Sequence, residues 1–268
     1  MKLAAVVVAL AACSHGAPAG PPPPSEPLPS SPLHGFMLPA TRLITAVADD
    51  WSSTKVTISV WTDRHLMLDR QVKVETGERE WQRDGEPFEA VIGRGGLAWG
   101  SGLHGVGAPD RHDGPIKQEG DARAPAGAFA IKSTFGFAST QGRRFYYRRF
   151  IQLDDQTECV DDPKSAAYNT IAEHTGSADW TSSEHMRTVT QYELGAVIDH
   201  NPARTPGAGS CIFLHVWDGP DSTTVGCTAM PKDRLEELLA GLDDHTVFVQ
   251  LPRAEYQALQ AEWGLPTQ

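Results

Sequence analysis

Apolar and polar residues alternate with a period of two along much of the chain from Thr41 onward. In the segment 55–63, for example, Val56, Ile58 and Val60 are separated from one another by single polar residues. Such alternation is typical of β-strands that bury one face. The other segments that we predict as strands are 70–76, the start of 89–105, 128–136, 143–153, 192–201, 210–217 and 246–251.

Helical periodicity is concentrated near the C-terminus. In the segment 231–244, Leu235, Leu238, Leu239 and Leu242 form one apolar stripe, which predicts an amphipathic helix. A weaker helical pattern covers 253–264, one short turn is expected in each of 165–174 and 182–190, and the glycine-dense segment 93–107 is expected to be a loop. These patterns predict a mainly β protein with a helix directly after Cys227.

The first 40 residues differ in composition from the rest of the chain. Lys2 precedes an apolar run, 3–12, that is too short to span a bilayer and is typical of an export signal. The run ends in LAAC, which resembles the lipobox of bacterial lipoproteins and implies lipid attachment at Cys13; an ordinary secretory signal is the alternative. Proline is dense in the next segment and favours an extended spacer.

We therefore expect an exported protein of the cell envelope or periplasm, held at a membrane by its N-terminal lipid. Its expected parts are a signal peptide at 1–12, a linker at 13–40, a catalytic domain at 41–252 and a helical tail at 253–268. The formal net charge is −11, which argues against a nucleic-acid partner, because phosphate contacts need clustered Lys and Arg. The basic cluster 142–150 is more typical of a solvated strand face.

The residues with the most distinctive chemistry lie in the segment 209–231. An apolar run ends at His215, a turn-rich insert follows, and Cys227 comes directly after Gly226. A thiol becomes a nucleophile when a nearby imidazole accepts its proton. The N–H groups of Gly226 and Cys227 are then candidates for an oxyanion hole.

Two other interpretations fit the same residues. Cys227 could be a buried or disulfide-bonded cysteine with Cys211 as its partner, and His215 a buried core residue. A zinc site would need more ligands, for which His104 and His112 are candidates, but the chain has no C-x-x-C or H-x-x-H spacing. We predict no metal and no cofactor.

Several segments resemble the YkuD-type catalytic domain of L,D-transpeptidases. The family motif is a His after an apolar strand, a spacer and then S/T-x-G-C; here His215 precedes the sequence TVGC at 224–227. Further resemblance, to one branch of exported members, lies in the segments 91–103, 117–138, 158–171, 179–186 and 192–202. The resemblance implies a β-sandwich or open barrel with a helix after the cysteine loop.

The resemblance also implies a reaction on the stem peptides of peptidoglycan. Cys227 would attack the amide carbonyl before D-Ala, His215 would be the base, and an amine or water would resolve the thioester. In the family a backbone carbonyl orients the histidine; Asp199 and His200 are side-chain alternatives here. Arg187, Tyr192 and Thr224 are candidate substrate-binding residues.

The chain departs from the commoner family motif at Val216, Val225 and Ala229, which leaves the acyl acceptor open. The alternatives are therefore an L,D-carboxypeptidase or amide hydrolase on the same fold, and an inactive cell-wall-binding lipoprotein. The chain has four cysteines. If Cys13 carries lipid and Cys227 is catalytic, Cys159 and Cys211 remain, and we predict a disulfide between them.

Overall fold

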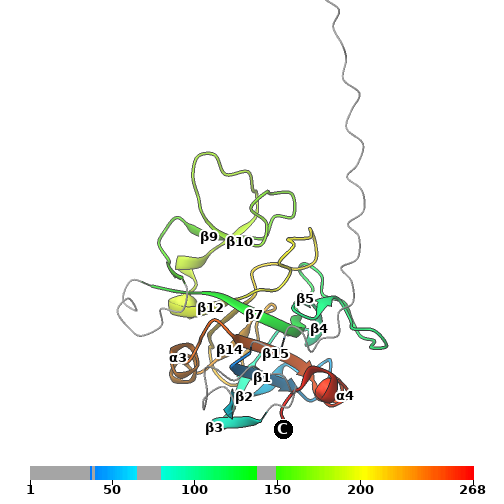
Figure 1. Ribbon diagram of the computed structural model, residues 1–268. Helices are drawn as coiled ribbons and strands as arrows, with labels where there is room; N and C mark the ends of the chain where they lie inside the picture. Colours follow the sequence, from blue (N-terminus) through cyan, green and yellow to red (C-terminus); the bar gives the residue numbers. More distant parts are fainter. Residues whose placement is uncertain (1–36, 38–39, 65–79, 138–148) are drawn as a thin grey trace, which may run out of the picture.

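The computed structural model describes residues 37, 40–64, 80–137 and 149–268. The predicted signal peptide, Cys13, most of the linker, the predicted strand 70–76 and most of the basic cluster 142–150 lie outside the described residues. The protein is mainly β, as predicted, and its body is a closed barrel of eight strands (Figure 1). In chain order these strands are β1 (Arg42–Ala48), β2 (Lys55–Asp63), β3 (Trp81–Val91), β7 (Ala124–Gly136), β12 (Leu194–Ile198), β13 (Phe213–Val216), β14 (Thr228–Met230) and β15 (Thr246–Pro252).

One long strand, β7, closes the barrel. Residues 127–130 of β7 pair with β15, and residues 131–136 pair with β12. The order around the barrel is β12-β13-β14-β3-β2-β1-β15-β7, and β7 then returns to β12. The family resemblance implied a β-sandwich or open barrel, and residue alternation alone could not correct this, because it identifies strands without saying which of them pair.

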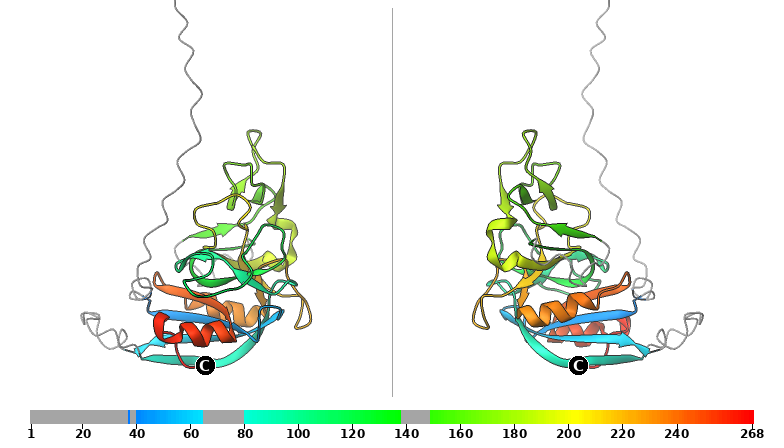
Figure 2. Two further views of the ribbon diagram at one scale, coloured as in Figure 1. Left: turned by 90° about the vertical axis from the view of Figure 1, so that its right-hand side faces the viewer. Right: turned by 90° about the vertical axis from the view of Figure 1, so that its left-hand side faces the viewer.

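Short strands flank the barrel. The predicted glycine loop 93–107 contains β4 (Leu97–Trp99), β5 (Ser101–Gly102) and β6 (Gly105–Val106), so the prediction of a continuous loop there was wrong. The strand β8 (Phe150–Gln152) pairs with β7. A separate sheet, which we call the small sheet, has the order β10 (Thr170–Glu173), β9 (Thr157–Val160), β11 (Ser183–His185) and projects from the barrel (Figures 1 and 2). The segment 165–174, where a short turn was expected, therefore ends in a strand.

The predicted helices are present. Helix α3 (Lys232–Ala240) buries Leu235, Leu238 and Leu239, whereas the predicted stripe residue Leu242 lies beyond its end. Helix α4 (Arg253–Trp263) buries three side chains in the core that also contains the barrel strands. Two short 3-10 helices, η2 (Met186–Thr188) and η3 (Thr190–Glu193), connect the small sheet to β12. Within the described part of the chain, no helix is long and apolar enough to cross a bilayer.

A second apolar cluster lies where the small sheet meets the barrel. Its buried members are Phe135, Leu153, Cys159, Met186, Tyr192, Phe213 and Cys227. Because these residues come from β7, β9, η2, η3 and β13, the cluster joins the small sheet to the barrel end that carries the candidate nucleophile.

Candidate active site

The loop before β14 holds Cys227 in the protein interior. The thiol is free and its residue is 4% exposed. The Thr224 hydroxyl donates a hydrogen bond to the Cys227 carbonyl at 2.7 Å and accepts one from the Gly226 N–H at 3.1 Å. The loop is also tied to the barrel, because the Thr224 N–H donates to the Ile92 carbonyl at 3.0 Å.

These bonds change the roles expected for two residues of the motif. The Gly226 N–H is already used by Thr224, so the predicted pair of oxyanion donors is not formed and the Cys227 N–H remains the donor candidate at the loop. The hydroxyl of Thr224, a candidate substrate ligand, is engaged twice within its own loop. Gly226 has φ 151° and a Cβ there would lie 3.1 Å from the Arg123 carbonyl oxygen, so the glycine is needed by the chain itself.

The Cys227 thiol lies among groups from three other segments. It accepts a hydrogen bond from the Phe213 N–H at 3.3 Å, and its Sγ lies 3.6 Å from the Cys211 carbonyl oxygen, to which it donates. Tyr192 belongs to the same apolar cluster as Cys227. The thiol is therefore held by backbone groups of Phe213 and Cys211 and lies in a cluster that includes an aromatic side chain of η3.

His215 lies on the neighbouring strand. In the parallel pairing of β13 with β14, Leu214 faces Thr228 and His215 faces Ala229, two residues after Cys227. Phe213, whose N–H binds the thiol, is two residues from His215 and therefore on the same side of β13. The Tyr192 ring packs edge-on against both, with ring centroids 5.4 Å from Phe213 and 5.2 Å from His215. Tyr192 thus packs against the imidazole and against the residue whose N–H binds the thiol.

A backbone carbonyl orients the imidazole. The Nδ1 of His215 lies 2.7 Å from the Val216 carbonyl oxygen, which can only accept a hydrogen bond. Nδ1 therefore carries the proton, and Nε2 of the neutral ring is free to accept one. The side-chain alternatives are engaged elsewhere: Asp199 pairs with Lys132 at 3.2 Å, and His200 lies between the Ser101 N–H and the Ala208 carbonyl.

Burial makes both reactive groups neutral. Burial raises the pKa of Cys227 to about 12, with the Glu184 carboxylate as the next cause. Burial also lowers the pKa of His215, against the opposing effect of the Val216 carbonyl. Because desolvation disfavours charged forms, the resting site holds a thiol and an imidazole rather than a thiolate–imidazolium pair.

Glu184 is a further carboxyl group near the thiol that the sequence patterns did not identify. The hydroxyl of Tyr192, which lies in the same apolar cluster as Cys227, donates a hydrogen bond to Glu184 Oε2 at 2.9 Å. Burial raises the pKa of this half-buried carboxyl group. Glu184 lies in the segment 179–186, which carried a family resemblance, but no local signal identifies it because it reaches the site only through the pairing of β11 with β9.

A disulfide links that small sheet to the strand of His215. Cys159 and Cys211 are bonded, as predicted, across a sequence separation of 52 residues. Glu184 stands directly opposite Cys159 in the β9–β11 pairing. Since the carbonyl of Cys211 accepts from the thiol, the disulfide connects the carboxyl-bearing sheet to a group that touches Cys227.

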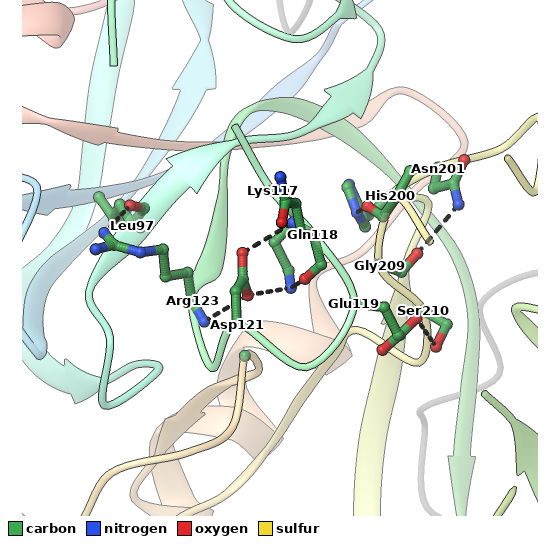
Figure 3. Close-up of polar contacts among 12 residues, drawn as sticks. Leu97, Lys117, Gln118, Glu119, Asp121, Arg123, His200, Asn201, Gly209 and Ser210 are labelled. Atoms are coloured by element: carbon green, nitrogen blue, oxygen red, sulfur yellow. Dashed lines mark hydrogen bonds and ion pairs between the residues drawn. The ribbon is translucent and has the colours of Figure 1, made fainter. Parts of the chain in front are cut away.

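Polar contacts within the loop 117–123 and from it to Ser210 fix the loop in place (Figure 3). The Asp121 carboxylate accepts from Lys117 Nζ at 2.6 Å and from the N–H groups of Gln118 and Arg123 at 2.8 and 2.9 Å. In the same loop, Glu119 accepts from the Ser210 hydroxyl at 2.8 Å. The loop therefore contacts the residue before Cys211 and, through the Arg123 carbonyl, the space beside Gly226.

The two expected carboxylate ligands differ in their surroundings. Arg187 is exposed, and its guanidinium lies over the Phe137 ring at 4.1 Å from the centroid, so it is free to meet an anion. Tyr192 is 5% exposed, and its hydroxyl already contacts Glu184. Tyr192 is thus placed to act on Cys227 and His215 rather than on a substrate carboxylate.

The histidines considered for a zinc site lie in other parts of the fold. His104 is buried against the Ala128 backbone, and His112 pairs with Glu255 at 2.5 Å. Within the described ranges, no group of three or more His, Cys, Asp and Glu side chains is arranged to hold a metal ion. Comparisons with family models, curated proteins and solved structures found no match.

Proposed function

We propose that this protein is a cysteine acyltransferase of the L,D-transpeptidase type that acts on peptidoglycan stem peptides. The observation that carries the proposal is that β13 brings two groups together on one side: Phe213, whose N–H binds the free Cys227 thiol, and His215, whose Nδ1 is held by the Val216 carbonyl, with the Tyr192 ring packed against both residues. The motif resemblance around His215 and Cys227, and a barrel followed by helix α3, support the same assignment.

The first half-reaction uses the neutral pair. Cys227 Sγ attacks the amide carbonyl carbon between the L-centre of the diamino acid and D-Ala, and its proton passes to His215 Nε2. The resulting oxyanion is stabilised by the Cys227 N–H. When the C–N bond breaks, His215 returns the proton to the amino group of the departing D-Ala, and the acyl group remains on Cys227 as a thioester.

The second half-reaction determines the product. Attack by an amine forms a new amide and gives a crosslinked peptide, whereas attack by water releases a shortened stem peptide. We further propose that the domain works outside the cytoplasm, delivered by residues 1–12 and held near a membrane by lipid on Cys13 and the proline-rich linker.

Product analysis tests this function. Purified full-length protein is incubated with a disaccharide tetrapeptide, and D-Ala release and muropeptide products are measured for the wild type, Cys227→Ala and His215→Ala. We expect Cys227→Ala to abolish D-Ala release and His215→Ala to slow it by about 10²–10⁴-fold. Dimers would indicate a transferase, tripeptides alone would indicate a carboxypeptidase, and no release from folded wild-type protein would contradict the proposal.

A further inference from the structure

A carboxyl group beside a nucleophilic thiol is an unfavourable neighbour for the first half-reaction. The Glu184 carboxylate accepts a hydrogen bond from the Tyr192 hydroxyl at 2.9 Å, and the Tyr192 ring packs against Phe213, whose N–H binds the Cys227 thiol. A negative charge at this position opposes thiolate formation and raises the pKa of the thiol. Glu184 therefore hinders acylation, so it has no evident use in forming the thioester.

The fold nevertheless holds Glu184 firmly in this position. It is the central residue of β11 and is paired opposite Cys159, whose disulfide fixes the small sheet to Cys211. Its carboxyl group is half-buried, which leaves part of it open to an incoming group. The charged groups around the pair are Asp161, which raises the pKa of Glu184, and Lys117, which acts in the opposite direction on Cys227 but is itself bonded to Asp121.

The second half-reaction has a requirement that a carboxylate meets. An aliphatic amine is an ammonium ion at neutral pH, and it must lose a proton before its nitrogen can attack a thioester. A carboxylate attracts the ammonium ion, and a carboxylate with a raised pKa is a better proton acceptor. Burial raises the pKa of Glu184 in this direction.

We propose that Glu184 binds the ammonium group of the acyl acceptor beside the Cys227 thioester and accepts its proton, so that the site favours transfer to a cationic amine over hydrolysis. The inference rests on the proposed function. The proton moves from nitrogen to the Glu184 carboxylate, the free amine forms a bond to the thioester carbon, and the C–S bond breaks. The Cys227 thiolate leaves. The nitrogen of the tetrahedral adduct releases a proton, which His215 passes to the thiolate. Glu184 returns its own proton to solvent.

The test compares two amine acceptors, each of which competes with water for the same acyl-enzyme. Full-length wild type, Glu184→Gln and Glu184→Asp are supplied with a disaccharide tetrapeptide donor and either a tripeptide bearing a free side-chain ammonium or hydroxylamine, which is largely neutral at pH 7. Dimer, hydroxamate and hydrolysed tripeptide are quantified. Because all products come from the same thioester, their ratios do not depend on how much folded enzyme is present.

We expect Glu184→Gln to lower the ratio of dimer to hydrolysed product by on the order of 100-fold and to leave the ratio of hydroxamate to hydrolysed product within about threefold. Glu184→Asp should restore part of the dimer. Removing the negative charge should also move the pH profile of Cys227 alkylation to lower pH, by less than unfolding in guanidinium chloride moves it, because the burial that raises the thiol pKa most is kept in the folded variant.

The outcomes separate this inference from the proposed function. If wild-type protein forms no acyl adduct on Cys227, the proposed function fails. If the adduct forms but Glu184→Gln keeps the wild-type ratio of dimer to hydrolysed product, the function stands and the role of Glu184 is overturned. An equal loss of dimer and hydroxamate would likewise overturn it, because Glu184 would then act on the site as a whole.

Discussion

The Cys227 thiol and the His215 imidazole both lie in the protein interior, and burial moves their pKa values in opposite directions. A cysteine protease-like ion pair would need the thiol pKa to fall below that of the imidazole. Here the thiol pKa is raised to about 12, so in the proposed reaction the proton leaves Sγ while the new C–S bond forms. The Phe213 N–H donates a hydrogen bond to the thiol, an effect that lowers the pKa of Cys227 against the stronger effect of burial.

The reactivity of Cys227 should report this shift. In the folded protein we expect the iodoacetamide alkylation rate of Cys227 to keep rising as the pH is increased beyond 9, because the thiol pKa lies near 12. In guanidinium chloride with the disulfide intact, the same thiol should titrate near the ordinary value of 9.0. A plateau below pH 9 in the folded protein would contradict the neutral pair.

Gly226 offers a second measurement on the nucleophile loop. Gly226→Ala should lower the free energy of unfolding by about 1–3 kcal/mol, because φ is 151° and the new Cβ would lie 3.1 Å from the Arg123 carbonyl oxygen. It should also slow acylation by displacing Cys227. Gly219→Ala is a control that measures the cost of backbone strain without a steric contact, because φ is 132° and no atom lies within 4 Å of the new Cβ. Gly176→Ala, with neither feature, should change stability little.

The candidate pair was accessible from the sequence because His215 and Cys227 lie in one short segment with a recognisable motif. Glu184 was not, because it reaches the site through the pairing of β11 with β9, and the contact of the Cys211 carbonyl with the thiol was not, because it depends on the pairing of β13 with β14. The burial of Tyr192 was missed for a related reason: it depends on Phe135 and Phe213, which β7 and β13 supply.

At the scale of elements, the small sheet and the barrel meet at the second apolar cluster and are joined covalently by one disulfide. Three short strands form the small sheet, which packs on the barrel through this cluster. The link between Cys159 and Cys211 therefore does more than stabilise the chain: it fixes the position of Glu184 relative to Cys227.

Loss of the disulfide should lower the stability of the protein and loosen the small sheet. The Cys159→Ser, Cys211→Ser double variant should lose roughly 4 kcal/mol of unfolding free energy, given the 52-residue separation of the two cysteines. Hydrogen exchange should rise in β9–β11 more than in β1, β2 and β15. Mild reduction of the wild type is the matched control, because it breaks the same bond without substituting either cysteine. Equal protection of the small sheet with and without the bond would show that the disulfide does not hold it.

Alternation with period two identified β2, β7, β12, β13 and β15, since each buries one or both faces in a recognisable pattern. It did not identify the closure of the barrel, because that depends on β7 having separate partners for its two halves. The short strands β4, β5 and β6 were hidden in a glycine-rich segment, where glycine signals a loop but also permits close strand contacts.

At the scale of the whole molecule, two buried histidines away from the candidate site tie loops to the barrel. His104 contacts the Ala128 backbone, and His200 lies between Ser101 and Ala208. Burial lowers the pKa of each from 6.5 to about 4. Below pH 6.5 the unfolded chain takes up protons that the folded imidazoles do not, so stability is present at neutral pH and is lost as the pH falls toward 4.

This linkage predicts a fall in unfolding free energy between pH 6.5 and pH 5, where most carboxylates remain ionised. Each histidine should contribute up to roughly 3 kcal/mol over the full window to pH 4. Denaturant titrations should give a smaller pH slope for His200→Asn than for the wild type. His245→Asn, which alters an exposed side chain, should keep the wild-type slope. Equal slopes in all three proteins would contradict this source of acid sensitivity.

The central claim is that Cys227 carries the acyl group of a stem peptide, and intact-mass spectrometry tests it most directly. Full-length wild type and Cys227→Ala are incubated with a disaccharide tetrapeptide, quenched in acid and weighed. We predict a thioester adduct on the wild type that corresponds to the substrate less D-Ala, is removed by hydroxylamine and is absent from Cys227→Ala. No adduct on folded wild-type protein, or an adduct that persists in Cys227→Ala, would contradict the account.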